Sequence, residues 1–184
     1  ACTMGQCQGT QTCAPIADVS AGGDHTCAVR TDGTLWCWGR NESGQLGTGT
    51  QDERRSPTRI GDTTWHWEMV SAGTAHTCAI RLDTTLWCWG DNTYGQLGDG
   101  TTDMKTSPVK VDGTGWTEVR AGKGTTCGVT AAGALRCWGD NAAGNLGNGT
   151  QDSSVVPVEV VGSNWTAVAV GPDHTCGVQT DNTL

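Results

Sequence analysis

The chain has 184 residues, among them 28 Gly, 10 Cys and 9 Trp, and 35% of the residues are hydrophobic. No apolar run approaches the roughly 18 residues of a membrane helix, so we expect no membrane insertion. A net charge of -8 would repel a polyanion over most of the surface and disfavours nucleic acid as a partner.

The first 15 residues form a segment distinct from the rest. It is rich in Gly, Gln and Thr, shows no strand pattern and carries Cys2, Cys7 and Cys13, so we predict an irregular N-terminal segment over residues 1–15. Pairing Cys7 with Cys13 is the most local option, and a bond to sequence outside this chain or to another subunit is the alternative. Any signal peptide is expected to have been removed or to lie outside the sequence, which starts at Ala1.

From residue 16 onward the sequence is repetitive. Equivalent cysteines recur every 49 to 51 residues, and each complete copy continues with the pattern W-G-x-N-x-x-G-Q/N-L-G-x-G-T, a proline and a tryptophan. We predict three copies and a partial fourth, over residues 16–66, 67–115, 116–164 and 165–184.

Each copy begins with two short apolar runs that flank a turn. If Thr31–Gly33 form a three-residue hairpin loop, Cys27 lies opposite Cys37 and a disulfide can join the strands. Such a bond would contribute roughly 2 to 3 kcal/mol by closing a short loop. A zinc site is disfavoured because the cysteines lack clustered Cys or His partners. The same register predicts the disulfides Cys27–Cys37, Cys78–Cys88 and Cys127–Cys137.

The period of two along these strands places apolar side chains on both faces. Cys27 and Val29 point to one face, and Trp36 and Trp38 point to the other. A sheet covered on both sides and repeated about every 50 residues is typical of stacked propeller blades. We therefore predict an all-β fold of antiparallel blades, with a further strand after the proline of each copy.

Two polar positions belong to the repeat itself. His25, His76 and His174 share one position, which is Thr125 in the third copy, and Asn41, Asn92 and Asn141 share another. A structural role in hydrogen bonding and turns explains both sets better than catalysis or ligand binding. The sequence holds no known catalytic or metal-binding motif, so we expect no enzyme, no metal site and no cofactor.

Departures from the repeat identify candidates for protein contacts. Two residues, Trp65 and His66, are inserted at the first junction, and the loops before the prolines differ between copies. Exposed aromatic, Arg and Met side chains are enriched at protein interfaces, and neutral surface variation is the alternative. The interaction candidates are Trp65, His66, Arg54, Arg55, Tyr94, Met104 and Lys105.

The repeat pattern, followed by V-x-A-G-x-x-H-T/S-x-A, resembles the regulator of chromosome condensation repeat over Ile16 to Leu184. The resemblance implies a seven-bladed β-propeller, of which this chain supplies about three and a half blades. The cysteine-bearing form looks like the one in secreted and surface proteins of bacteria. Members of the family act through protein surfaces, as a nucleotide exchange factor, an ultraviolet photoreceptor and an inhibitor of a β-lactamase.

The chain is too short for a complete seven-bladed propeller. Seven copies need about 340 residues, and the sequence stops before the strand that would pair with Cys176. Either these residues are part of a longer chain, or strands from a neighbouring copy complete the open edge in a self-assembled ring or filament.

These observations favour a secreted or cell-surface, non-catalytic module for protein interaction, adhesion or structural assembly, with an unidentified protein partner. Ten cysteines are typical of an oxidising compartment. The alternative is a secreted inhibitor of, or binding domain attached to, an extracellular hydrolase; a guanine nucleotide exchange factor is less compatible with the cysteines. Three sequons, at Asn41, Asn148 and Asn164, suit an exported chain but depend on the host.

Overall fold

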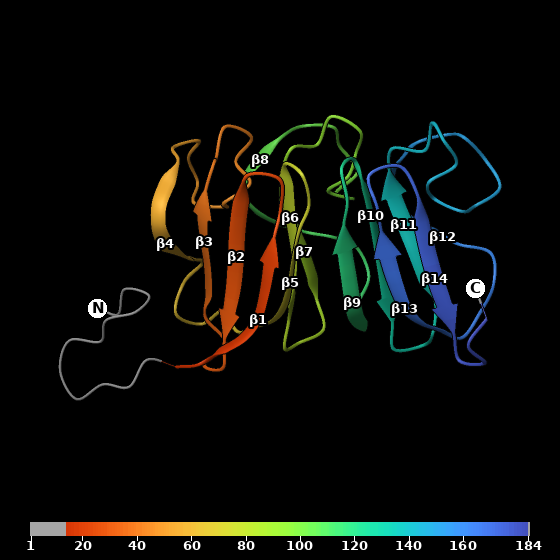
Figure 1. The fold of residues 1–184 in the computed structure, drawn as a ribbon, viewed down its shortest axis with the longest axis horizontal. Helices are drawn as coiled ribbons and strands as arrows, with labels where there is room; N and C mark the ends of the chain where they lie inside the picture. Colours follow the sequence, from red (N-terminus) through yellow and green to blue (C-terminus); the bar gives the residue numbers. More distant parts are fainter. Residues whose placement is uncertain (1–13, 184) are drawn as a thin grey trace.

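A computed structural model describes residues 14–183, and strands are the regular elements of this part of the chain. Three antiparallel four-stranded sheets and one two-stranded sheet follow each other in sequence order (Figure 1). The all-β blade architecture predicted from the repeat is confirmed.

The first sheet contains β1 (Ile16–Ala21), β2 (His25–Arg30), β3 (Leu35–Gly39) and β4 (Arg54–Ile60). The second contains β5 (Trp67–Ala72), β6 (His76–Arg81), β7 (Leu86–Gly90) and β8 (Lys105–Lys110). The third contains β9 (Trp116–Ala121), β10 (Thr125–Thr130), β11 (Leu135–Gly139) and β12 (Ser154–Glu159), and the last pairs β13 (Trp165–Val170) with β14 (Thr175–Gln179).

The order of strands within each sheet is a meander. The first strand of every sheet contacts the first strand of the next, so β1, β5, β9 and β13 form the inner row of the stack. The outermost strands, β4, β8 and β12, pair on one side only. We refer to the four sheets as blades 1 to 4.

The predicted hairpin register is confirmed. Cys27 pairs with Cys37, Val29 with Leu35 and Thr26 with Trp38 across β2 and β3. Gly33 has a φ of 76°, as the turn requires. The disulfides Cys27–Cys37, Cys78–Cys88 and Cys127–Cys137 join directly opposed positions, with Cα atoms 4.0 to 4.1 Å apart.

The outer strand differs from the prediction. The predicted segment, from Pro108 to Val111 in the second copy, is largely in a strand, but the strand starts earlier, so that Pro108 lies inside β8 and Pro157 inside β12. Proline lacks an N–H, and these strands lie at a sheet edge, where one side of the backbone needs no ladder partner.

The hydrophobic cores lie between blades rather than within them. Between blades 1 and 2, Leu35 and Leu46 pack with Trp67 and Trp89. Between blades 2 and 3, the corresponding set includes Leu86, Leu97, Trp116 and Trp138. A single blade therefore cannot bury its apolar faces without a neighbour on each side.

Candidate protein-interaction surfaces

The loops between the third and fourth strands are held by the repeated asparagines. The side-chain nitrogen of Asn41, which is fully buried, donates to the carbonyls of Thr50 and Asp52 at 2.9 Å, and its oxygen accepts from the N–H of Leu46. Asn92 and Asn141 make the same contacts in their own loops. The predicted turn role of these residues is confirmed, and Asn41 is too buried to serve as a glycosylation acceptor in the folded chain.

The repeated histidines connect neighbouring blades. His25 Nε2 lies 2.7 Å from Thr77 Oγ1, which donates to the carbonyl of Gln45, so the ring donates from Nε2. The indole of Trp89 donates to the same carbonyl at 2.9 Å. Burial outweighs the charge of Asp24 and lowers the pKa of His25 to about 4. His25 is therefore neutral and structural at pH 7.

The second joint repeats this arrangement, and the third does not. His76 contacts Thr126, whose hydroxyl donates to the carbonyl of Gln96, and burial also lowers the pKa of His76 to about 4. In blade 3 the histidine position is Thr125, whose hydroxyl donates to Asp140 O within the same blade. His174, in blade 4, is exposed.

The structure separates the predicted interaction residues into two groups. Arg54, Arg55, Tyr94, Met104 and Lys105 lie in or beside the loops after β3 and β7, which we call the loop end. Trp65 and His66 belong to the β4–β5 connection, where His66 adjoins Gly33 of the hairpin turn. Antiparallel strands place these segments at opposite ends of a blade, so the seven residues cannot form one surface.

At the loop end, most of the predicted residues already have neighbours. Arg55 pairs with Glu53 at 2.9 Å, Lys105 with Asp99 at 3.6 Å, and the sulfur of Met104 accepts from Gln51 at 3.7 Å. The Arg55–Glu53 pair is exposed and worth at most about 1 kcal/mol, so a partner could replace it at low cost, whereas the side chain of Asp99 is only 9% exposed. Tyr94 is 49% exposed beside Gly124 of blade 3.

Trp65, in contrast, is not a free surface side chain. It is half-buried against the core between blades 1 and 2, and its ring covers the guanidinium of Arg81 at 3.8 Å. Trp87 covers the other side of Arg81 at 3.9 Å. The insertion at the first junction thus closes a joint between blades, because an indole buries apolar surface there and binds the cation.

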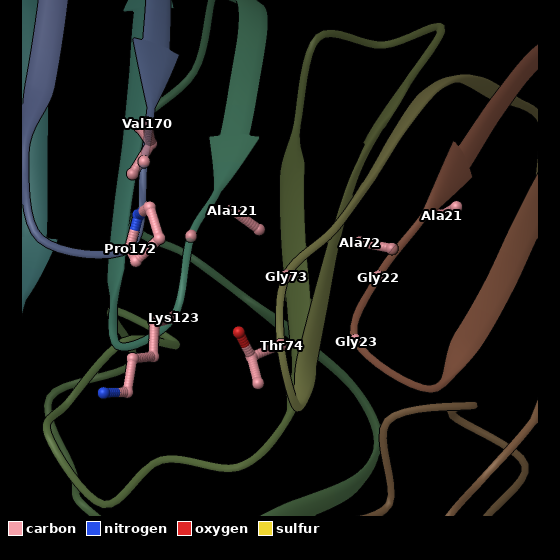
Figure 2. Close-up of a pocket in the computed structure, with 12 residues that line it drawn as sticks. Ala21, Gly22, Gly23, Ala72, Gly73, Thr74, Ala121, Lys123, Val170 and Pro172 are labelled. Carbon is pink, nitrogen blue, oxygen red and sulfur yellow. The ribbon is translucent and has the colours of Figure 1, made fainter.

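A shallow hollow of about 220 Å³ lies where the inner strands end (Figure 2). Its lining is mainly Gly and Ala, and Thr74 and Lys123 are the lining residues with polar side chains. A Cβ at Gly22 would collide with the carbonyl oxygen of Gly73, so the repeated glycine allows the backbones of neighbouring blades to meet. The hollow offers little chemistry beyond one ammonium group.

Cys176 is an exposed free thiol on β14, and Cys2, Cys7 and Cys13 lie outside the described residues. Within residues 14–183, no cluster of three or more His, Cys, Asp or Glu side chains could hold a metal ion. The same residues contain no helix long and apolar enough to cross a membrane.

Sequence reasoning missed Arg81 and Trp87 because both occupy ordinary strand positions. Arg30 and Trp36 are their counterparts in the first copy, which made them look like part of the repeat. Only the contact with the inserted Trp65 distinguishes Arg81 and Trp87 from these counterparts.

Two models of the regulator of chromosome condensation (RCC1) repeat match the chain, one at residues 32–80 and 132–178 and the other at residues 16–45 and 70–96. The chain belongs to the RCC1 repeat family. The resemblance noted in the sequence is confirmed, and each RCC1 repeat here contributes strands to a propeller blade.

Several characterised RCC1-repeat proteins are similar over about half of the chain. The human E3 ubiquitin-protein ligase HERC2 is 34% identical over 100 residues, covering 53% of this chain and 2% of that protein. The ultraviolet-B receptor UVR8 of Arabidopsis thaliana is 37% identical over 101 residues, covering 54% of this chain and 23% of the receptor. Human protein RCC2 is 40% identical over 90 residues, covering 47% and 17%. The chain thus matches less than a quarter of each of these relatives.

Solved RCC1-type structures share the fold. Human WBSCR16 superimposes with a TM-score of 0.81 at 21% identity, over 93% of this chain and 48% of that one. Prp20p of Saccharomyces cerevisiae superimposes with a TM-score of 0.78 at 20% identity, over 86% and 42%. The chain thus spans 48% of the first structure and 42% of the second.

Proposed function

We propose that this chain is a non-catalytic, protein-binding part of a propeller that works outside the cell or on its surface. The observation that carries the proposal is the set of three disulfides, one in each complete blade, whose six cysteines are all 0% exposed. Disulfides persist in oxidising compartments and are rare in the cytosol. They would keep each hairpin rigid while the loops present contact residues.

Protein binding is favoured over catalysis by the way polar groups are used. His25 and His76 are occupied in the joints between blades, and the buried asparagines hold the loops. The hollow in Figure 2 is open and carries a single ionisable side chain, Lys123. Catalytic sites normally combine several convergent polar groups in a deep pocket.

Relatives support the same class of function. Prp20p has been studied for its binding to Gsp1p and histones, and yeast RCC1 has been solved bound to Kap60. These ligands are proteins, which suits a propeller that acts through its surface. At 20% identity these particular partners are not assigned to this chain. We propose separately that its protein contacts serve adhesion or structural assembly.

The test uses site-specific photo-cross-linking with the oxidised protein. A photoreactive residue replaces Tyr94 at the loop end, His66 at the opposite end, or, as a control, Val161, which is 79% exposed in the connection between β12 and β13. Intact cells and secreted proteins of the source organism are then exposed to each variant. We expect a discrete adduct from position 94 or 66 that excess unlabelled protein suppresses.

Identical adducts from all three positions, or none, would contradict the binding function. Non-reducing mass spectrometry of the protein from its source gives the compartment, because free thiols at the six blade cysteines would contradict an oxidising location. Sedimentation of the pure protein distinguishes self-assembly from binding to another protein. An adduct with a hydrolase would favour the inhibitor or attached-domain alternative.

A further inference from the structure

Departures from the repeat gather at one place on blade 2. We define the Arg81 corner as Trp65, His66, Arg81, Leu82 and Thr84. Trp65 belongs to the insertion at the first junction. The amide of Leu82 donates to the carbonyl of His66 at 3.1 Å, as Ala131 does to Gly115 and Thr180 to Asn164, so His66 occupies a position that the repeat shares. The insertion and the hairpin turn of blade 2 therefore form one continuous surface.

The turn itself is unusual. Thr84 has a φ of 61°, where the equivalent residues are Gly33, Gly133 and Asn182. A β-branched residue pays a steric cost in this region, and here the Thr84 hydroxyl also accepts from the amide of Gly115 at 3.1 Å. Leu82 is 61% exposed at a position that is Thr31, Ala131 or Thr180 in the other copies. The turn of blade 2 thus combines a β-branched residue at positive φ, Thr84, with an exposed aliphatic residue, Leu82.

Arg81 has a positive charge and no anionic partner. Its guanidinium lies between Trp65 and Trp87, with ring centroids 3.8 and 3.9 Å away. Within residues 14–183 it forms no ion pair, and its buried Nε and Nη2 atoms lack hydrogen-bond partners. The third nitrogen, Nη1, is not among the buried atoms. A charged donor without an acceptor is uncommon in a native structure and requires an explanation.

The neighbouring carboxylates are occupied elsewhere. Asp83 accepts from the hydroxyl of Thr85 at 2.6 Å, and Asp62 accepts from both the amide and the hydroxyl of Thr64. These hydrogen bonds keep the pKa of Asp62 and of Asp83 below the usual value. Neither carboxylate is within 4 Å of Arg81.

An open hollow of about 240 Å³ adjoins the guanidinium. It is lined by Thr64, His66, Arg81, Leu82 and Asp83. The hollow therefore combines a cation with the exposed aliphatic side chain of Leu82. Its volume suits one side chain and adjoining backbone rather than a large cofactor.

We propose that the Arg81 corner binds a protein segment that carries a carboxylate side chain next to an aliphatic side chain. The carboxylate accepts from Arg81 Nη1, and the aliphatic group packs on Leu82. Trp65 and Trp87 hold the guanidinium flat, so little side-chain entropy is lost when the partner binds. The inference rests on the proposed protein-binding function and adds to it the site and the chemistry of the partner.

The experiment uses two blocked pentapeptides, Gly-Leu-Glu-Leu-Gly and Gly-Leu-Gln-Leu-Gly, titrated into the oxidised protein with ¹⁵N-labelled indoles. Assigned signals of Trp65 and Trp87 report the site. We expect both signals to shift saturably with the Glu peptide, and roughly tenfold weaker binding of the Gln peptide, because a charge-assisted hydrogen bond is lost.

Repeat copies supply matched variants. R81T introduces the residue found at Thr130 and should reduce the affinity for the Glu peptide to that for the Gln peptide. L82T introduces the residue found at Thr31 and should weaken both peptides roughly threefold. R30T, the same change in blade 1, should leave both affinities unchanged.

Several outcomes would overturn the inference. These are equal affinity for the two peptides, unchanged binding by R81T, or an equal loss with R30T. If R81T fails to fold, by near-ultraviolet circular dichroism, L82T and R81K decide, since R81K keeps the charge but loses the planar fork and should weaken the Glu peptide several-fold. If neither peptide shifts the Trp65 and Trp87 signals of the unmodified protein, this site is rejected. The proposed protein-binding function would still stand if cross-linking at Tyr94 gives a discrete adduct.

Discussion

His25 Nε2 lies 2.7 Å from the hydroxyl of Thr77, which is 52 positions further along the chain and in the next blade. Thr77 donates in turn to Gln45, so the contact returns to the first blade. The first two copies of the repeat thus carry the histidine of a joint whose threonine is supplied by the following copy.

Acid should weaken these joints. The pKa of His25 and of His76 is lowered from 6.5 to about 4 by burial, so the unfolded chain binds protons first as the pH falls. The free energy of unfolding keeps the full contribution of the two neutral histidines above pH 6.5. It decreases toward pH 4, by about 2 to 3 kcal/mol for each histidine. Urea unfolding at pH 7 and pH 4.5 measures this difference. The H25T/H76T variant, which copies Thr125, should lose most of the pH dependence, and an unchanged slope would contradict the assignment.

The hydrogen bond of Trp89 should contribute to stability, unlike the indole N–H of Trp38. Trp89 is fully buried and donates to Gln45 O, whereas Trp38 is half-buried and has no such acceptor among the described residues. We expect W89F to destabilise by about 1 to 2 kcal/mol and W38F by well under half of that. Chemical denaturation of the two variants tests the comparison. Equal losses would mean that indole packing alone stabilises the joint.

Removal of one disulfide should destabilise the protein without changing its fold. Replacing Cys78 and Cys88 together by Ala opens a cross-link between positions separated by 10 residues and should cost about 2 to 3 kcal/mol. Thermal unfolding measures the cost, and the circular dichroism spectrum checks the fold. The C176A variant is the control, since Cys176 is a free thiol and should tolerate the change.

Asn92 should be essential for its loop. Its side chain is 0% exposed, donates to the carbonyls of Thr101 and Asp103, and accepts from Leu97. N92A leaves these groups unpaired in a buried loop, so we expect a loss of about 2 to 4 kcal/mol. Hydrogen exchange should increase at Leu97 in particular. N148A, in a more exposed loop position, should cost much less, and comparable losses would contradict the anchoring role.

Much of the blade was predictable because its signals are local. The ten-residue spacing between Cys27 and Cys37 is compatible with a three-residue loop that ends at Gly33, and that loop places both side chains opposite each other. The wrong starting point of the outer strand has a local cause too: Pro108 was read as a boundary, although an edge strand tolerates it.

The candidate surfaces were less predictable. Trp65 was identified as a departure from the repeat, but its interpretation as an exposed contact residue did not anticipate Arg81. The two residues are 16 positions apart, and their contact depends on how the connection between blades folds back over the joint. No periodicity in the sequence encodes that path.

By itself, the sequence determined the repeat, the strand pattern and the three disulfides, because these depend on spacings within one copy and on the alternation of side chains along a strand. Only the tertiary structure decided where His25 finds its partner, which candidates share a surface, and that Arg81 forms no ion pair within residues 14–183. Burial, pKa and hydrogen bonding at a joint depend on atoms supplied by two blades, and these atoms meet only when the blades stack.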